Sequence, residues 1–274
     1  MREKRKKSHG CRNFILYCII VAAVWYFGTF TLKTTEVRIE TEQIDNPIKI
    51  VQISDLHGSE FGKENEFLVE AIKSAEPDVI IVTGDMYTAG DLDGQNTAVS
   101  LMHRLAKAYP VYFVHGEHDN DRAYEKRLTE AGVDVLDYEW RDITVGTSTI
   151  RLYGITNVFY TETFDLTNEF VLDQNVYNIL AAHIANFGAF ADFGMDLSLC
   201  GDTHGGQVRL PYLGALTNGE TWLPEHQEGD CKYMKGLYTL GESKLFVNSG
   251  LGNYPVPIRF LNRPEVAIIT LMPE

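Results

Sequence analysis

Five short motifs rich in aspartate and histidine, spread between residues 55 and 204, constrain this chain more than any other feature. Each follows an apolar run of the kind that forms a β-strand. The carboxyl ends of strands in an α/β sheet open into one crevice, so side chains placed there are brought together. The pattern therefore predicts an α/β fold with a metal site, built from Asp55-Leu56-His57, Gly84-Asp85, Gly116-Glu117-His118-Asp119, Ala182-His183 and Gly201-Asp202-Thr203-His204.

The first half of the chain alternates strand-like and helix-like segments. Strands are expected at residues 34–44, 48–54, 79–83 and 111–115, and helices at residues 64–75, 97–108 and 120–131. The run at 79–83 is apolar throughout, as in a strand that is buried on both faces. The alternation predicts parallel strands joined by right-handed crossover helices.

Two details of these helices follow from the sequence. The first helix is expected to bury one apolar face, formed by Phe67, Leu68, Ala71 and Ile72. The third helix is expected to be capped by Asp119 or Asn120, because these side chains accept hydrogen bonds from the free amides of a first turn.

The second half of the chain has shorter elements. Strands are expected at residues 133–136, 143–145, 150–153, 178–182, 197–200, 236–240, 245–248 and 266–270, and helices at 162–172 and 186–191. Gly241-Glu242-Ser243 separates two of these strands like a hairpin turn. Residues 35–274 are therefore expected to form one domain of two packed sheets with helices on the outside.

The N-terminus differs from the rest of the chain. Basic residues precede an uncharged apolar stretch at residues 14–32, which at about 1.5 Å per residue spans a bilayer core of roughly 30 Å. A cleaved signal peptide and a buried core helix are the alternatives. The stretch ends in bulky aromatic residues rather than a small-residue cleavage site, which favours an uncleaved anchor over residues 1–34. The positive flank predicts a cytoplasmic N-terminus and an extracellular domain.

Charge changes sharply at this boundary. The whole chain carries −14, and residues 1–34 hold seven Lys or Arg and one Glu, so residues 35–274 carry −20. A domain this acidic repels nucleic acid, so no nucleic-acid partner is expected. Cys200 and Cys231 lie in the domain, where export permits a disulfide, although a free buried thiol at Cys200 is the simpler interpretation.

Taken together, the motifs resemble those of the calcineurin-like metallophosphoesterases, in particular the membrane-anchored or exported bacterial branch. The resemblance extends from about residue 48 to residue 270. It depends on the order and spacing of the five motifs, together with Gly205-Gly206-Gln207 and Asn248-Ser249-Gly250. It implies a four-layer α/β-β-α sandwich, here with an N-terminal transmembrane helix, and hydrolysis of a phosphoester by a hydroxide that two divalent metal ions activate.

The resemblance also implies a role for each motif residue. One metal is expected to bind Asp55, His57, Asp85 and His204. The second metal is expected to bind Asp85, Glu117, His183 and Asp202, so Asp85 is shared. His118 matches the family's general acid, and Asp85 and His118 are therefore the expected catalytic residues.

Two of these positions depart from the family pattern. Glu117 replaces an asparagine of the family, and Asp202 replaces a histidine. Both replacements are oxygen ligands, which favours harder ions such as Mn²⁺ or Mg²⁺ over Zn²⁺. Manganese is the expected ion, with iron, zinc and magnesium as alternatives. The lower net positive charge favours a monoanionic diester over a dianionic monoester, and a damaged second site is the alternative interpretation.

Other residues leave more than one interpretation open. His115 either orients a ligand or is a satisfied buried histidine, and Thr203 is either a supporting hydroxyl or a turn residue. An apolar segment after the last motif forms either a substrate gate, a membrane-facing patch or ordinary packing; it contains Tyr212, Leu213, Leu216, Trp222, Leu223 and Met234. Asn253 and Arg259 are polar candidates without a defined role.

The expected protein is thus a monomeric, single-pass, membrane-anchored phosphoesterase. Its expected substrates are phosphodiesters or pyrophosphates, lipid-linked ones among them. A catalytically weak metal-binding or sensory surface protein of the same fold is the competing hypothesis, because the altered residues Glu117 and Asp202 both belong to the second metal position.

Overall fold

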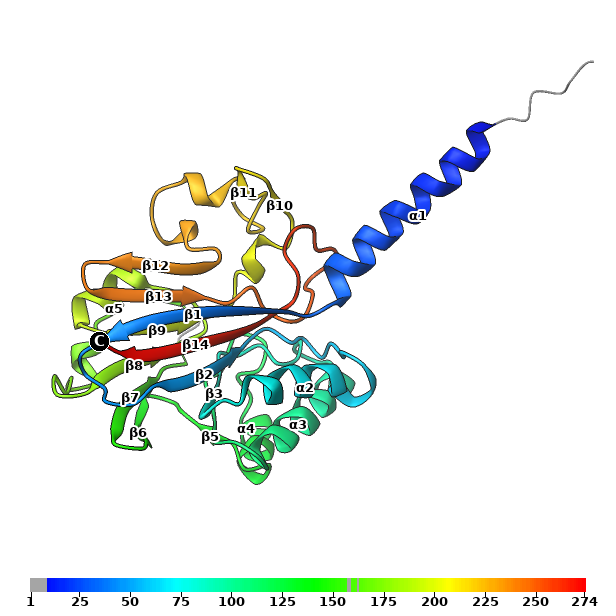
Figure 1. Ribbon diagram of the computed structural model, residues 1–274. Coiled ribbons are helices and arrows are strands. Elements are labelled where there is room, and N and C mark those ends of the chain that lie inside the picture. The colour runs from blue at the N-terminus through cyan, green and yellow to red at the C-terminus, as the bar shows by residue number, and fades with distance from the viewer. Residues whose placement is uncertain (1–8, 157–158, 162) are drawn as a thin grey trace, which may run out of the picture.

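A computed structural model describes residues 9–156, 159–161 and 163–274 of the chain (Figure 1). One six-stranded mixed sheet carries the N-terminal strands and the C-terminal strand. Its order is β1 (Lys33–Thr41), β14 (Glu265–Pro273), β2 (Ile48–Ile53), β3 (Val79–Val82), β4 (Val111–Phe113) and β5 (Asp134–Val135). Strands β2 to β5 run parallel, and β14 is antiparallel to β2.

A second six-stranded mixed sheet packs against the first. Its order is β12 (Gly236–Leu240), β13 (Ser243–Val247), β9 (Leu197–Cys200), β8 (Tyr177–Ala181), β7 (Ser148–Gly154) and β6 (Glu139–Val145). Strands β10 (Arg209–Leu210) and β11 (Gly214–Ala215) form a separate small ladder. The turn predicted at residues 241–243 joins β12 to β13, which pair antiparallel.

Helices cover both outer faces. The helices of the first sheet are α2 (Glu66–Ala75), α3 (Leu92–Ala106) and α4 (Arg122–Glu130), whereas α5 (Phe187–Phe193) packs on the second sheet. A separate core of buried side chains, including Ile50, Ile81 and Ile179, fills the space between the sheets. The predicted four-layer sandwich is therefore confirmed.

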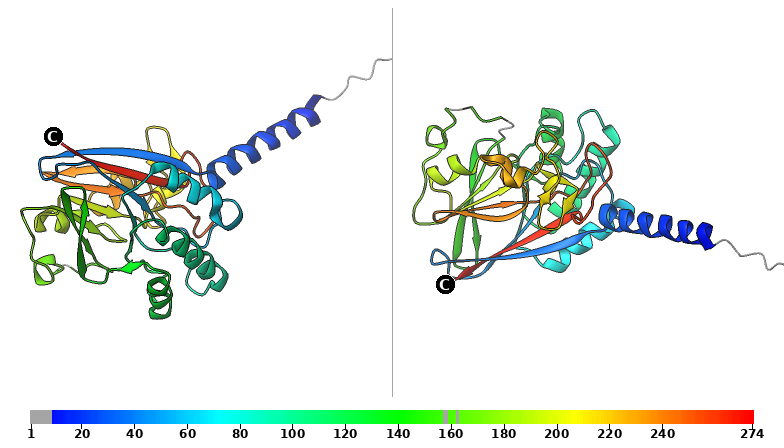
Figure 2. Two further views of the ribbon diagram at one scale, coloured as in Figure 1. Left: turned by 60° about the horizontal axis from the view of Figure 1, so that its bottom comes forward. Right: turned by 90° about the horizontal axis from the view of Figure 1, so that it is seen from above.

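The N-terminal helix α1 (His9–Phe30) projects from the sandwich in every view (Figures 1 and 2). Residues Gly10–Phe30 are long and apolar enough to cross a membrane, a test that a signal sequence also passes. Of residues 10–30, only Gly28 and Thr29 are buried. Strand β1 begins at Lys33, and the division predicted between residues 34 and 35 stays a prediction.

Several predicted details were wrong. Phe67 is 62% exposed, and α2 instead buries Val69 and Ala75 beside Leu68 and Ile72. Helix α3 begins at Leu92 rather than residue 97, because the Asp91 side chain caps it by accepting a hydrogen bond from the Gly94 amide.

The start of α4 and the segment before β8 also differ from expectation. Asp121 caps α4, whereas Asp119 turns inward to accept hydrogen bonds from the amides of Gly116 and Met86. Of the helix predicted at 162–172, the described part forms only a 3-10 turn, η2 (Leu166–Asn168), and residue 162 lies outside the described residues. The other 3-10 turns are η1 (Lys63–Asn65), η3 (His204–Gly206), η4 (Pro224–His226) and η5 (Asp230–Lys232).

Strand direction places the motif-bearing loops close to α1. Strand β1 leaves α1 and runs away from it, and β14 runs parallel to β1. Because β2 is antiparallel to β14, the strands β2, β3 and β4 run back toward α1 and end on its side of the sandwich (Figure 1). The first three motifs, which follow these strands, therefore lie at the α1 end of the domain.

Candidate metal centre

The motif loops are joined to one another by backbone hydrogen bonds. The Asp55 amide donates to the Gly84 carbonyl at 3.0 Å, and the His57 amide donates to the Asp85 carbonyl at 3.0 Å. In the second sheet, the Gly201 amide donates to the His183 carbonyl at 2.9 Å. These bonds fix the loops relative to one another, so the candidate side chains are held on a rigid frame.

Five candidate residues have left-handed backbone conformations. Such φ values are uncommon outside glycine and concentrate at functional sites, where surrounding structure holds them in place. The values lie between 46° and 70°, at Asp55, His57, Asp85, Asp202 and His204. The chain therefore accepts local strain at the positions from which these side chains converge.

Close packing of two loops explains two of the motif glycines. Gly84 has φ +84°, and a Cβ there would overlap the Gly116 backbone. A Cβ at Gly116 would overlap the Asp85 carboxylate. Both positions therefore need glycine so that the loops after β3 and β4 can approach each other.

The side chains of Asp55, His57 and His204 converge on one point. Their nearest ligand atoms lie within 4.8 Å of one another. Nε2 of His57 is 3.2 Å from Nε2 of His204, which lies 3.7 Å from Oδ1 of Asp55. One carboxylate and two imidazoles in this arrangement suit a divalent cation.

The Asp85 carboxylate belongs to two further groups of this kind. It forms one group with Asp55 and His183, and another with His57 and His118. Oδ2 of Asp85 is 3.3 Å from Nε2 of His183 and 3.8 Å from Nε2 of His57, while Oδ1 accepts a hydrogen bond from the His118 amide at 2.9 Å. Asp85 thus lies between the two sets of imidazoles, as a shared ligand must.

Groups behind the imidazoles orient them. Nδ1 of His183 donates to the Thr83 carbonyl at 2.7 Å, which leaves Nε2 facing Asp85. Nδ1 of His57 lies 3.0 Å from the Thr88 hydroxyl. Such contacts fix the ring and its tautomer in metal sites. Nε2 of His183 and Nε2 of His118 are buried without a hydrogen-bond partner among the described residues, which fits donor atoms that serve a cation or a substrate.

Burial and neighbouring charges set the pKa values of these groups. Burial raises the pKa of Asp55 to about 7. Burial also opposes ionisation of Asp85, but the charge of His183 and several hydrogen bonds outweigh it and lower the pKa of Asp85 to about 2. Burial lowers the pKa of His57 to about 4, so its ring is neutral near pH 7 and has a lone pair available for a cation.

The two residues that depart from the family pattern lie at the edge of this arrangement. Oδ1 of Asp202 is 3.8 Å from Nε2 of His183. The Glu117 side chain is 48% exposed and approaches His118, with Oε1 3.6 Å from Nε2. The described structure therefore gathers five predicted metal ligands, Asp55, His57, Asp85, His183 and His204, in compact groups, together with His118. Asp202 and Glu117 lie outside those groups.

The loop before β14 contributes an aromatic residue that the motif analysis missed. The Tyr254 ring stacks on His57, with centroids 5.0 Å apart and an interplanar angle of 11°, and packs edge-on against His118 at 4.6 Å. Tyr254 therefore covers one side of the candidate site. No motif marks it, because it follows the last histidine motif by fifty residues and lies in an irregular loop.

Arg259, a polar residue without an assigned role in the sequence, also reaches the site. Its side chain is 1% exposed and donates to the carbonyls of Ser249 at 2.8 Å and Gly252 at 2.6 Å. Nη2 lies 3.4 Å from Nδ1 of His204. Arg259 therefore fastens the loop of Tyr254 against the histidine motifs.

Replacing Arg259 with Met is expected to lower the Tm of the full-length chain by about 5–15 °C. The substitution leaves buried carbonyls without donors, at about 1–3 kcal/mol each, and each kcal/mol corresponds to about 2–4 °C in a domain of this size. Circular dichroism in detergent measures the change. The control is Arg141→Met, which breaks partly exposed ion pairs to Asp134 and Glu139 and should shift Tm by less than about 4 °C. Equal shifts would show that Arg259 does not stabilise the loop.

The remaining open positions have ordinary structural partners. Nδ1 of His115 bonds the Asp119 carbonyl at 2.8 Å, and the Thr203 hydroxyl donates to the Met234 carbonyl at 2.7 Å.

Cys200 and Cys231 are both free, so the alternative of a disulfide between them is not formed. In the apolar segment, Met234 is buried but Trp222 is 68% exposed, and Tyr212 is fully exposed.

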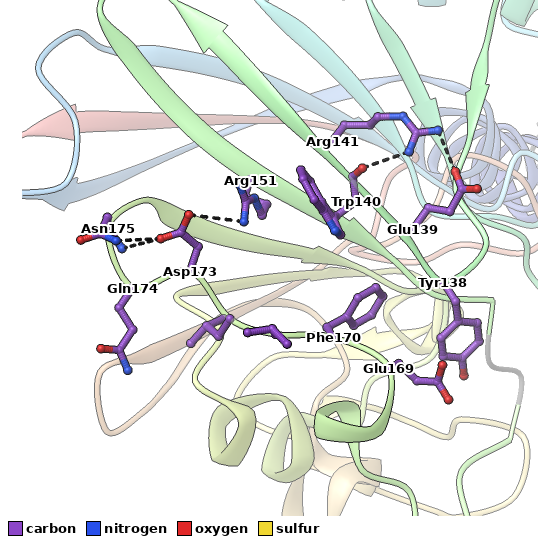
Figure 3. Close-up of a pocket in the computed structure, with 12 residues that line it drawn as sticks. Tyr138, Glu139, Trp140, Arg141, Arg151, Glu169, Phe170, Asp173, Gln174 and Asn175 are labelled. Atoms are coloured by element: carbon purple, nitrogen blue, oxygen red, sulfur yellow. Dashed lines mark hydrogen bonds and ion pairs between the residues drawn. The ribbon is translucent and has the colours of Figure 1, made fainter.

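A cavity of about 900 Å³ lies away from the motif residues, between β6, β7 and the segment before β8 (Figure 3). The Arg151 guanidinium stacks over Trp140 at 4.1 Å and forms ion pairs with Asp142 and Asp173. Because neighbouring carboxylates neutralise the charge of Arg151, this cavity attracts an anion only weakly even though arginines line it.

Comparison with known proteins gives a family match. The model of the calcineurin-like phosphoesterase family matches residues 48–206. The Bacillus subtilis metallophosphoesterase YkuE is 27% identical over 90% of this chain and 87% of its own length. The Escherichia coli phosphodiesterase YaeI is 29% identical over 82% of this chain and 83% of its own length.

Two further proteins resemble the chain less closely. A Danio rerio transmembrane protein with a metallophosphoesterase domain is 24% identical over 98% of this chain and 65% of its own length. Among solved structures, Thermus thermophilus sulfate thiohydrolase SoxB aligns with a TM-score of 0.46 at 14% identity, over 83% of this chain and 57% of that chain.

Proposed function

Because the chain belongs to the calcineurin-like phosphoesterase family, we propose that it is a membrane-anchored enzyme that hydrolyses phosphodiester or pyrophosphate bonds with two divalent metal ions. The observation that carries this proposal is the position of Asp85. Its carboxylate lies between His183 on one side and His57 on the other, and its pKa of about 2 keeps it ionised. A charged carboxylate that faces imidazoles on both sides is the feature that a dinuclear centre requires.

The assigned ligands are those predicted from the sequence. Asp55, His57, Asp85 and His204 hold the first ion, and Asp85, Glu117, His183 and Asp202 hold the second. When bound, the two ions activate water and neutralise charge on the phosphoryl oxygens. The close grouping of Asp55, His57 and His204 supports the ligand set of the first ion. The short distance between Asp85 and His183 supports two of the ligands assigned to the second ion.

His118 is assigned the proton that the leaving group receives. The backbone amide of His118 donates a hydrogen bond to Asp85, which places the residue beside the shared carboxylate. Its buried Nε2 has no hydrogen-bond partner among the described residues. A ring in this position donates a proton to the leaving oxygen, or stabilises the charge that develops there. Tyr254 packs against the same ring and restricts its movement.

Charge supports a diester as substrate. The assigned ligands include four carboxylates, Asp55, Asp85, Glu117 and Asp202, which together balance the charge of two divalent ions. A neutral centre in an acidic domain attracts a dianionic monoester less than a centre with excess positive charge does. A monoanionic diester carries less negative charge, so its attraction to the centre falls less than that of the monoester. The same charge disfavours nucleic acid, and the chain is proposed to act as a monomer.

The second candidate function is that of a metal-binding or sensory surface protein. One observation favours it, because Glu117 is 48% exposed and lies outside the compact groups of ligands. A second ion held by fewer ligands would support little turnover. Turnover measurements separate the two functions.

Reverting the altered positions is expected to change metal preference. The double variant Glu117→Asn/Asp202→His removes two oxygen ligands with charge and adds an imidazole, so the ratio of Zn²⁺ to Mn²⁺ affinity should rise by about tenfold or more. Competition between the two ions, followed by metal analysis, measures this ratio. Glu220→Gln, a loop substitution near Asp202, is the control and should leave the ratio unchanged. An unaltered ratio in the double variant would remove both residues from the ligand set.

Helix α1 is proposed to anchor the domain, with the N-terminus in the cytoplasm and the domain outside. Support comes from its length and composition, its basic N-terminal flank and its aromatic end. Protease added to intact spheroplasts should digest the domain while the helix stays with the membrane. A domain that resists protease until the cells are lysed would reverse the orientation.

The proposed activity is tested with bis-p-nitrophenyl phosphate and p-nitrophenyl phosphate as paired substrates. The full-length protein in detergent is treated with chelator, and Mn²⁺, Mg²⁺ or Zn²⁺ is then restored singly. We expect activity to disappear with chelation, to return best with Mn²⁺ and to be faster on the diester. Failure of every ion to restore turnover in a folded protein would favour the binding function.

A further inference from the structure

A groove of about 470 Å³ lies where α1 meets the loop that precedes β14. Its apolar wall is formed by Val24 and Phe27 of the helix, and by Phe260 and Leu261 of the loop. The groove is separate from the histidine motifs. It is built where this loop lies alongside the apolar helix.

The loop extends along the helix rather than stopping at its end. Nε1 of Trp25 donates to the Pro257 carbonyl at 2.8 Å, and Trp25 precedes the last helical residue by five positions. At 1.5 Å per residue, the loop therefore reaches roughly 7 Å down the helix from its end. A helix of 22 residues is about as long as a bilayer core is thick, so this depth lies just inside the acyl-chain region when the helix spans a bilayer.

Exposed apolar side chains of the loop fit that location. Val256 is 51% exposed, Ile258 is 49% exposed and Leu261 is 61% exposed. Three large aliphatic side chains within six residues would be costly in water but not against acyl chains. The loop surface beside α1 is therefore matched to lipid.

The rim of the groove is cationic, although the domain as a whole is acidic. Lys33, Lys235 and Arg263 line it. Arg263 lies 4.4 Å above the Phe27 ring and bonds the Thr31 hydroxyl at 2.9 Å. Among the described residues, no carboxylate forms an ion pair with Lys33 or Arg263.

One carboxylate does approach the rim. Oε1 of Glu265 is 3.8 Å from Nζ of Lys235, but Glu265 is 1% exposed and also accepts hydrogen bonds from Ser249 and Thr35. The three cations therefore leave an excess positive charge at the rim. In a domain that carries −20 overall, a cationic rim beside an apolar wall is complementary to an anionic amphiphile.

We propose that this groove binds one anionic phospholipid, with its phosphate at Lys33, Lys235 and Arg263 and an acyl chain along Val24, Phe27, Phe260 and Leu261. The inference rests on the proposed anchoring of α1 in a membrane. Two hydrogen bonds link the groove to the metal centre, because Lys235 donates to Asn262 at 2.8 Å and Asn262 donates to the His204 carbonyl at 2.7 Å. A bound lipid thus holds the site-forming loop against the membrane surface.

Native mass spectrometry of the delipidated full-length chain in detergent tests the proposal. Palmitoyl-oleoyl phosphatidylglycerol and the matching phosphatidylcholine are titrated separately in the presence of EDTA. We expect one phosphatidylglycerol to bind with about tenfold higher affinity than phosphatidylcholine, since each basic residue near the headgroup favours an anionic lipid. Equal affinity for the two lipids would overturn the proposal.

Two variants locate the lipid. Lys33→Gln/Arg263→Gln should lower phosphatidylglycerol affinity by about tenfold, and Leu261→Asp, at a wall position whose side chain is 61% exposed, should weaken binding of the acyl chain. The control Lys107→Gln/Lys126→Gln removes the same charge at the C-terminal cap of α3 and within α4, and should bind as the wild type does. Binding that is unchanged in Leu261→Asp, or lost equally in the control, would place the lipid elsewhere.

A competition experiment distinguishes a lipid from a free phosphate. Glycerol 1-phosphate at millimolar concentration should displace little phosphatidylglycerol, because it lacks the acyl chain that the apolar wall contacts. Full displacement would make the headgroup alone the ligand and overturn the lipid proposal. Lipid binding is measured without metal or turnover, so its failure is distinct from failure of the proposed hydrolysis, and membrane flotation tests the anchor separately.

Discussion

Replacing Asp85 with Asn is expected to lower kcat/KM for bis-p-nitrophenyl phosphate by more than about 100-fold. Loss of a group that only supports a metal ligand costs roughly 10–100-fold, and Asp85 belongs to two of the three groups of converging ligands. Asparagine keeps the shape of the side chain but removes the charge that the two proposed ions would share. The same variant should retain less Mn²⁺ per chain.

Asp121→Asn is the matched control. It makes the same chemical change at the exposed cap of α4, where asparagine caps as well as aspartate does. Its rate and metal content should equal those of the wild type. A folded Asp85→Asn protein with a near-normal rate would show that Asp85 is not the shared ligand.

Replacing His118 with Ala is expected to lower hydrolysis of glycerophosphoethanolamine by about 10²–10⁴-fold, the range that a general acid contributes. The loss should be smaller for bis-p-nitrophenyl phosphate, because p-nitrophenolate leaves with little help from a proton. The hydrogen bond from the backbone amide of residue 118 to Asp85 does not involve the His118 ring, so it persists in the alanine variant. Comparing kcat for the two substrates therefore isolates proton donation.

The control for this experiment is His103→Ala, at an exposed histidine of α3 whose ring lies within hydrogen-bond distance of the Ala131 carbonyl. It should not change either rate. Equal losses on both substrates in His118→Ala would indicate that the ring positions another group instead of donating a proton.

Much of the frame was predictable because it depends on local patterns. The apolar runs that became β2, β3 and β4 are short and regular, and the motif residues at their ends needed only the sheet to bring them together. Asp55 and Asp85 therefore lie close to one another, as the strand order required. The alternation of strands and helices likewise predicted two sheets with helices outside.

Details that depend on long-range packing were not predictable. The sequence predicted Asp119 or Asn120 as the cap of α4, but Asp119 is drawn inward by the amides of Gly116 and Met86, and Asp121 caps the helix instead. Tyr254 and Arg259 reach the site from an irregular loop without periodicity. Sequence also cannot tell that the Glu117 side chain is half exposed, since this depends on the path of the loop after β4.

The most direct test of the account is electron paramagnetic resonance of the full-length chain loaded with Mn²⁺, combined with metal analysis. We expect two manganese ions per chain and an exchange-coupled spectrum, because Asp85 is assigned to both ions. The coupled spectrum should be absent from Asp85→Asn. One ion per chain, or two ions that behave as isolated Mn²⁺, would contradict a dinuclear centre at these residues.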